Sequence, residues 1–275
     1  MMRIFISWLI NMKYEIIKLF QQKIFSISLI ALLIFHGTMI AITEYPISRA
    51  EKQIENIDTI TIERFIKYDR AMQSQEIGEI DFEDQTFINE YENKYLSELQ
   101  PYLMKKYEHK VALDQYDNYI DGVLLFAKEH DSKMLKRYEQ LQNIEIEQPI
   151  NSGDIAVLKS LSPSLALILF AFLIPNFMMH ADIENDSFYE TLSGGKRKLI
   201  LSKIFTALLI TLIFSVLLSV MSMLVNTYLY GSLSLTLNIQ SFMEFIQSPY
   251  NITIIQSILI MTLWNCLITF SLVCI

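Results

Sequence analysis

The chain has 275 residues, 52% of them hydrophobic, and a mean hydropathy of +0.31, which excludes an ordinary soluble domain. The formal net charge of −8 argues against a nucleic-acid partner, because nucleic-acid-binding domains are basic. Both cysteines, Cys266 and Cys274, lie in the last apolar segment, so the polar segments have no disulfide framework and must be held together by packing.

The hydrophobic residues are concentrated in four segments that contain no Asp, Glu, Lys or Arg: 24–43, 161–180, 204–230 and 253–275. Each is long enough to cross the ~30 Å hydrocarbon core of a bilayer, which takes roughly 20 helical residues. An isolated segment in lipid must be helical, because only then are its backbone N–H and C=O groups satisfied. We therefore predict an all-α membrane protein in which four transmembrane helices are visible.

Residues 1–23 are expected to form a cytoplasmic amphipathic helix at the inner membrane surface. Six apolar residues fall near one face of this helix: Ile4, Trp8, Met12, Ile16, Leu19 and Phe20. The segment carries four basic residues and one acidic residue, Glu15, and short positive flanks stay in the cytoplasm. The alternative is that these residues simply extend the helix of the first span. Separately, Met12 is an alternative to Met1 as the first residue of the natural chain. Because no small-x-small cleavage site follows the first span, we interpret it as an uncleaved anchor.

Residues 44–160 then lie outside, and their apolar residues recur every three or four positions, which is typical of amphipathic helices. One such stripe combines Leu113, Tyr116, Ile120, Leu124 and Ala127 with Met134, Tyr138 and Leu141. The segment holds 14 basic and 24 acidic residues, but long translocated domains are not governed by the positive-inside rule. We predict a mostly helical extracellular domain between the first two spans.

The two short polar loops differ in charge. Loop 181–203 has acidic residues in its first half and four basic residues in its second half, whereas loop 231–252 has no Lys or Arg. The positive-inside rule places 181–203 in the cytoplasm and 231–252 outside. Charge segregated in this way indicates that a cytoplasmic partner contacts loop 181–203.

Residues 192–196 read Leu-Ser-Gly-Gly-Lys and are similar to the signature of ABC ATPases, but we interpret this similarity as coincidence. The signature acts on ATP held by a phosphate-binding loop, and the sequence contains no G-x-x-x-x-G-K-[ST] motif. It contains no H-E-x-x-H motif and no Cys/His cluster for zinc either. We therefore expect no enzymatic activity, metal or cofactor on this chain.

Two polar residues within the apolar segments, His36 and Asn176, are candidates for an intramembrane polar site. Ionisable groups in hydrocarbon are costly and often functional. A neutral histidine that is hydrogen-bonded between helices is the simpler interpretation of His36. Asn176 follows Pro175, and this pair predicts a helix kink with a polar contact to another helix.

Two segments resemble the type-2 ABC transporter permeases. In the cytoplasmic loop, the matching residues are Glu184-Asn185-Asp186-Ser187, Glu190, Leu192-Ser193, Lys196-Arg197-Lys198 and Leu201-Ser202-Lys203. Before the first span, they are Lys13-Tyr14-Glu15-Ile16-Ile17-Lys18 and Lys23-Ile24-Phe25. The loop departs from the family at Gly194, where proline is frequent, but glycine also forms turns. The resemblance covers about 1–43 and 161–230.

The resemblance implies a permease subunit of an ATP-driven exporter in a bacterial plasma membrane. Its loop would form a coupling helix on a separate ABC ATPase subunit, which binds the ATP, and the contact residues would be Glu184, Glu190, Lys196 and Arg197. A second permease copy or a paralogue is the other implied partner. Because the family usually has six spans, the natural chain is expected to continue past Ile275.

Two other functions stay open. One is that of the mechanotransmitting ABC permeases, which have four spans and an outer domain after the first. Those proteins typically have a longer inner segment between the second and third spans, and their outer domains are mixed α/β. The other is that of a membrane sensor or scaffold whose helical outer domain binds a ligand. The charge pattern of loop 181–203 would also be explained, without any partner, by acidic and basic residues that pair along an exposed helix.

Overall fold

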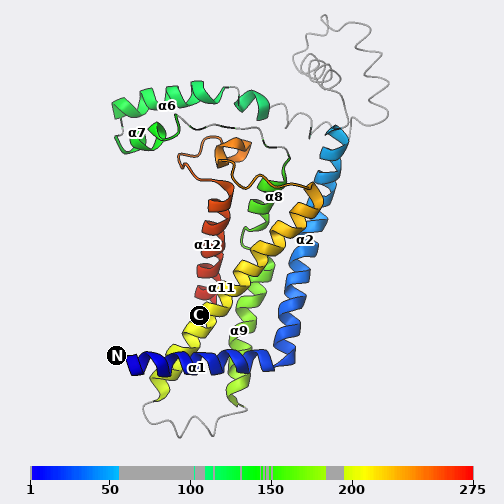
Figure 1. Ribbon diagram of the computed structural model, residues 1–275, viewed down its shortest axis with the longest axis vertical. Coiled ribbons are helices and arrows are strands. Elements are labelled where there is room, and N and C mark those ends of the chain that lie inside the picture. Colours follow the sequence, from blue (N-terminus) through cyan, green and yellow to red (C-terminus); the bar gives the residue numbers. More distant parts are fainter. Residues whose placement is uncertain are drawn as a thin grey trace, which may run out of the picture. The chain divides into compact units, whose positions relative to one another are not determined.

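The computed structural model describes residues 2–55, 102, 109–113, 115–130, 132–142, 144, 146, 149, 151–183 and 195–274. The described residues are mostly helical (Figure 1), and β-structure among them is limited to one isolated bridge between Asn238 and Thr253. The chain divides into two compact units. The first comprises Met1–Ile42, Asp154–Gly231 and Ile255–Ile275, and the second comprises Thr43–Gly153 and Ser232–Ile254.

Four helical segments of the described chain are long and apolar enough to cross a membrane: Lys23–Ile54, Gly153–Met178, Ile200–Tyr230 and Ile254–Cys274. They contain most of the four charge-free segments found in the sequence. The prediction of a helical protein with four candidate membrane spans is therefore confirmed for the described residues.

Three of the helices extend beyond the charge-free segments. Helix α2 (Lys23–Glu55) contains the first span and continues past Pro46. Helices α9 (Leu165–Ile183) and α11 (Gly195–Tyr230) both run into loop 181–203, so that only 184–194, outside the described residues, lies between them. Charged residues mark where a chain leaves hydrocarbon, but a helix satisfies its own backbone and can continue into water.

A break interrupts the second span. Helix α8 (Gly153–Ser160) ends before a short turn over 161–164, and α9 follows. Pro163 in this turn lacks a backbone N–H and disfavours a helical conformation at the residue before it. The side chain of Asn265, on α12 (Ile254–Cys274), donates from Nδ2 to the backbone O of Leu161 at 2.6 Å. A carbonyl freed by the break is thus satisfied inside the bundle.

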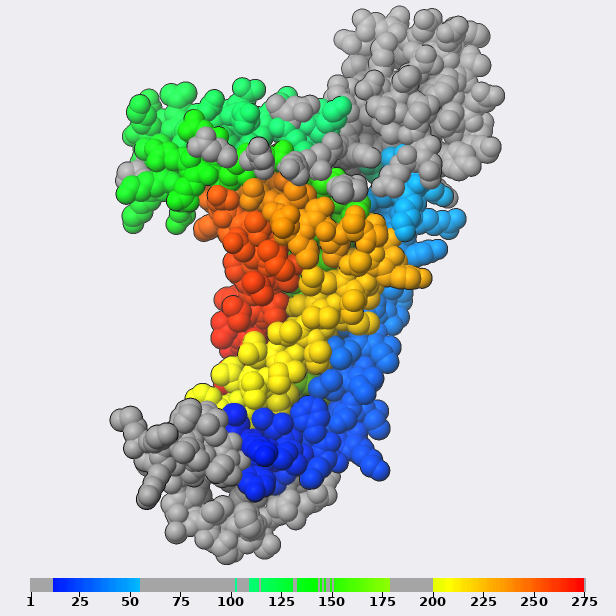
Figure 2. All heavy atoms as spheres, viewed as in Figure 1, coloured from blue at the N-terminus to red at the C-terminus, as the bar shows by residue number. Residues whose placement is uncertain are grey.

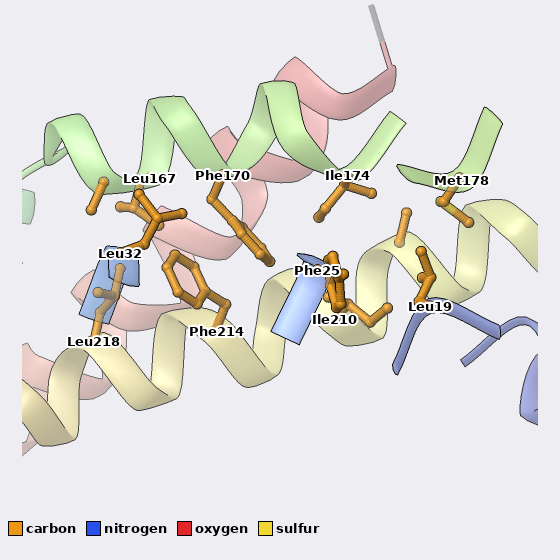
Figure 3. Packing of buried hydrophobic residues seen from close by; sticks show 12 residues of the cluster. Leu19, Phe25, Leu32, Leu167, Phe170, Ile174, Met178, Ile210, Phe214 and Leu218 are labelled. Carbon is orange, nitrogen blue, oxygen red and sulfur yellow. The ribbon is translucent and has the colours of Figure 1, made fainter. Parts of the chain in front are cut away.

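One apolar cluster holds the first unit together, and α1 (Met2–Gln21), α2, α9 and α11 all contribute to it (Figure 3). Phe170 of α9 stacks on Phe214 of α11, with ring centroids 3.8 Å apart. The other buried members are Leu19, Phe25, Leu32, Ala166, Leu167, Ile174, Met178, Ala207, Ile210 and Leu218. Because lipid is as apolar as these side chains, the cluster stabilises the bundle through close packing.

The second unit has its own cluster, between α6 (Tyr116–His130) and α7 (Ser132–Glu139) and the residues that follow them. Its buried members are Tyr116, Ile120, Tyr138 and Leu141, and Leu124 and Met134 pack beside them. All six belong to the apolar stripe predicted from the sequence, and that prediction is confirmed for them. The structure divides the stripe between two helices.

Candidate functional site

The structure places the backbone of two of the four predicted coupling residues. Glu184 and Glu190 lie outside the described residues. Lys196 and Arg197 stand in the first turn of α11, because this helix begins at Gly195, but their side chains are also outside the described part. The site is therefore built from the residues next to segment 184–194.

Helix α1 carries a buried carboxylate, that of Glu15. Glu15 is 5% exposed, and its Oε1 lies 3.9 Å from Nζ of Lys18, one turn further along α1. The ammonium of Lys203 on α11 also interacts electrostatically with Glu15. These cationic partners matter because a buried, unpaired charge is costly. Glu15 and Lys203 come from the two sequence segments that carry the family resemblance, and the fold brings them together.

The apolar face predicted for α1 includes Leu19 and Phe20. Leu19 is 1% exposed, whereas Phe20 is 47% exposed. Glu15 is buried on the same helix, beside Lys18. A cation next to a buried carboxylate offsets part of the cost of its burial.

Helix α1 packs against both helices that flank segment 184–194 (Figure 1), and its atoms lie directly on those of α11 in Figure 2. Gln22, just after α1, donates from Nε2 to the backbone O of Phe177 on α9 at 3.3 Å. Phe25, at the start of α2, meets the ring of Phe177 edge-on, with centroids 5.4 Å apart. Together with buried Leu19, these contacts fix α1 to the described ends of α9 and α11.

His36 makes a contact between helices. It is 5% exposed on α2, and its Nε2 lies 3.0 Å from Oγ of Ser222 on α11. Gly37 lies beside Met221 on α11, and a β-carbon there would displace the terminal methyl of Met221. The interhelical hydrogen bond expected for a neutral His36 is thus present.

Asn176 does not join His36 in a common site. Its side chain is exposed, and Nδ2 donates to the backbone O of Phe172, one turn earlier in the same helix, at 2.8 Å. This hydrogen bond stays within α9, so it is not the contact with another helix that the sequence predicted for Asn176.

Sequence reasoning missed a polar face on α11. Its buried polar residues are Ser202, Thr206, Thr211, Ser215, Ser219, Ser222 and Asn226. From Thr211 onward they are spaced by three or four residues and form one stripe along the helix. This spacing is visible in the sequence, but averaged hydropathy hides it, because long apolar side chains surround each small hydroxyl.

Two of the buried polar residues of α12 contact this face. Buried on α12 are Ser257, Thr262, Asn265, Cys266 and Thr269. Oγ of Ser219 lies 2.6 Å from Oγ1 of Thr262, and Oγ1 of Thr211 lies 3.7 Å from Sγ of Cys266. We name these buried polar residues of α11 and α12 the polar seam. Its two cross-helix contacts join α11 to α12 at Thr211 and at Ser219.

Among the described residues, no group of three or more His, Cys, Asp or Glu side chains could hold a metal ion. Comparisons of the chain with protein-family models, with curated proteins and with solved structures found no match. The resemblance to the type-2 ABC permeases therefore stays a prediction.

Proposed function

We propose that this chain is a membrane-spanning permease subunit of an ATP-driven ABC exporter in a bacterial plasma membrane. Segment 181–203 would couple it to a separate ATPase subunit, and its N-terminus would be cytoplasmic. The observation that carries this proposal is the packing of α1 on both α9 and α11, the helices on either side of that segment. The four apolar helices support a location in the membrane.

The contacts of α1 provide a mechanical route. A push on segment 184–194 acts first on the ends of α9 and α11. Both ends are packed on α1 and on the start of α2 through Leu19, Gln22 and Phe25. Close-packed helices shift as bodies rather than deform continuously. A displacement at the segment would therefore move the first span together with the second and third.

The charges at the start of α11 favour an acidic partner. Lys196, Arg197 and Lys198 occupy its first turn, which contains no acidic residue. The positive end of the helix dipole disfavours cations there by about 0.3–1 kcal/mol each. Carboxylates on a partner would relieve this cost, and such ion pairs determine register and partner choice more than affinity.

The helical second unit favours this exporter class over the mechanotransmitting permeases. Helices α6 and α7 pack through their own apolar cluster, and the described part of this unit has no β-strand. The outer domains of the mechanotransmitting class are typically mixed α/β.

Co-expression tests the proposal. The chain would be expressed with the ABC ATPase encoded nearest to its gene, purified through a tag on the ATPase, and reconstituted in lipid nanodiscs. We expect a stable complex in which the permease changes the rate of ATP hydrolysis. Arg197→Glu and Glu190→Arg should weaken that effect several-fold, because both reverse charges at the proposed contact.

Lys128→Glu, an exposed reversal on α6, is the matched control and should behave as wild type. If both reversals at the contact leave complex formation and ATPase rate unchanged, segment 181–203 is not the coupling element. If no ATPase co-purifies, the permease proposal itself fails.

A further inference from the structure

The loop that joins α11 to α12 belongs to the second unit and not to the helices that it connects. Residues Ser232–Ile254 form one compact unit with Thr43–Gly153, whereas α11 and the rest of α12 belong to the first unit. The division falls at Gly231, whose φ of 90° lies in the left-handed region that glycine adopts without strain. Its backbone N–H donates to the backbone O of Thr227 at 2.8 Å, which ends α11. We name residues 232–253 the strap.

The two legs of the strap are tied to each other by hydrogen bonds. The N–H of Ile239 donates to the backbone O of Ile252 at 3.0 Å, next to the isolated bridge between Asn238 and Thr253. The N–H of Ile254, at the start of α12, donates to the backbone O of Leu237 at 2.9 Å. An isolated pairing of two short legs is only marginally stable in water. The paired form of the strap therefore depends on what it packs against.

The strap docks on α6 and α7. The side chain of Ile246 packs against the apolar cluster of these helices. The phenolic O–H of Tyr138 donates to the backbone O of Gln247 at 3.4 Å, and the guanidinium of Arg137 lies 5.6 Å from the centroid of the Tyr250 ring. These contacts hold the second leg of the strap on α7.

The first leg has attachments of its own. Nε2 of His109 lies 2.7 Å from the backbone O of Ser241, and it must carry the proton because a carbonyl only accepts. Nδ2 of Asn151 donates to the backbone O of Ser232 at 3.2 Å. The strap is thus attached at several points along its length, and each partner belongs to the second unit.

The docking contacts are weaker than the packing beneath them. The bond from Tyr138 is near the upper limit of hydrogen-bond length. Arg137 and Tyr250 are both exposed, so water competes with their cation–π contact. The buried members of the cluster, by contrast, all belong to α6, α7 and the residue Leu141 that follows them. The strap can therefore open while α6 and α7 stay folded.

We propose that the strap is a releasable restraint on α11 and α12. Its 22 residues could span more than about 70 Å if extended, so the length of the loop alone does not limit how far the ends of the two helices separate. Docking on α6 and α7 keeps the legs paired and holds these ends together, and release of the strap lets them move apart. The inference does not depend on the chain being a permease.

Hydrogen exchange of the full chain in nanodiscs, read by mass spectrometry, tests the docking. Arg137→Gln and Tyr250→Leu each remove the cation–π contact and should speed exchange of the Ile239 amide about 2- to 5-fold. Ile246→Ala removes an apolar anchor and should speed it at least ~10-fold. The amides of α6 should stay protected in all three variants. Lys136→Gln, which removes an exposed charge next to Arg137 on α7, is the matched control and should change nothing.

Pulsed electron paramagnetic resonance tests the restraint itself. In a background without native cysteines, spin labels would be attached through Tyr228→Cys on α11 and Leu259→Cys on α12. Both residues are exposed, at 86% and 58%, so the labels do not disturb buried packing. Adding Ile246→Ala should broaden the distribution of distances between the labels toward longer values, and adding Lys136→Gln should leave it unchanged.

Two results would overturn the proposal. If the strap amides of all three variants exchange at the parental rate, these contacts do not hold the strap. If the amides exchange faster while the distances between α11 and α12 stay the same, the docked strap does not restrain the helices. Should Ile246→Ala also expose the amides of α6, Arg137→Gln and Tyr250→Leu decide in both measurements, because they leave the apolar cluster intact.

Discussion

Neutralising Glu15 should destabilise α1 and weaken its packing on α11. The side chain of Glu15, taken without its backbone, is 7% exposed, and its Oε1 lies 3.9 Å from Nζ of Lys18. At an effective dielectric constant of about 20, two unit charges at this distance attract each other by about 4 kcal/mol. Removing one partner of a buried pair costs about 3–5 kcal/mol. The Lys18 side chain is 26% exposed and therefore partly hydrated. We therefore expect Glu15→Gln to lower the free energy of unfolding by about 2 kcal/mol.

The assay is a double-mutant cycle on chemical unfolding in detergent micelles, with Glu15→Gln, Lys203→Met and the double variant. A direct interaction between α1 and α11 should give a coupling energy of about 1 kcal/mol. Trypsin should also cleave after Lys18 faster in Glu15→Gln, because a released α1 exposes its backbone. Glu129→Gln, an exposed change on α6, serves as control. A coupling below about 0.3 kcal/mol with unchanged cleavage would refute the reasoning.

Three further predictions address the rest of the structure. Ser222→Ala should destabilise the bundle by about 0.6 kcal/mol, because His36 loses its partner, and thermal unfolding of this variant beside Ser222→Thr measures the effect. Phe214→Ala should cost about 3–5 kcal/mol in the same assay, because it leaves a cavity against Phe170, whereas Ile213→Ala on the exposed side should cost little. Burial raises the pKa of Tyr116 to about 12, above its ordinary value of 10.0, so its stabilising contribution should be complete below pH 10 and be lost as the pH rises to about 12. Ultraviolet titration of tyrosinate should show one late-ionising residue fewer in Tyr116→Phe.

The sequence was sufficient to predict the four candidate spans. A charge-free apolar segment of about 20 residues is almost always a helix that is buried in lipid or in protein. The sequence was also sufficient for the packed stripe of α6 and α7, where Tyr116, Ile120 and Tyr138 repeat at helical spacing and are buried together. Both predictions rest on local periodicity, which a single helix determines by itself.

Features that depend on neighbouring helices could not be predicted in the same way. Glu15 is buried and interacts electrostatically with Lys203, which is distant in the sequence. Helices α2, α9 and α11 extend beyond the charge-free segments, because charge limits the part of a helix in lipid and not the helix itself. The polar seam was missed because serine and threonine serve equally well on lipid-facing and buried sides of a span until the partner helix is known.

The hydrogen bond from Asn265 to Leu161 has a consequence for how the protein can evolve. The turn at Pro163 frees a carbonyl in the bundle, and Asn265 satisfies it from another helix. Leucine at position 265 would orphan that carbonyl, and a continuous helix through 161–164 would leave the asparagine with nothing to bind. Neither change is neutral alone, so homologues should carry the proline turn and the asparagine together or lack both.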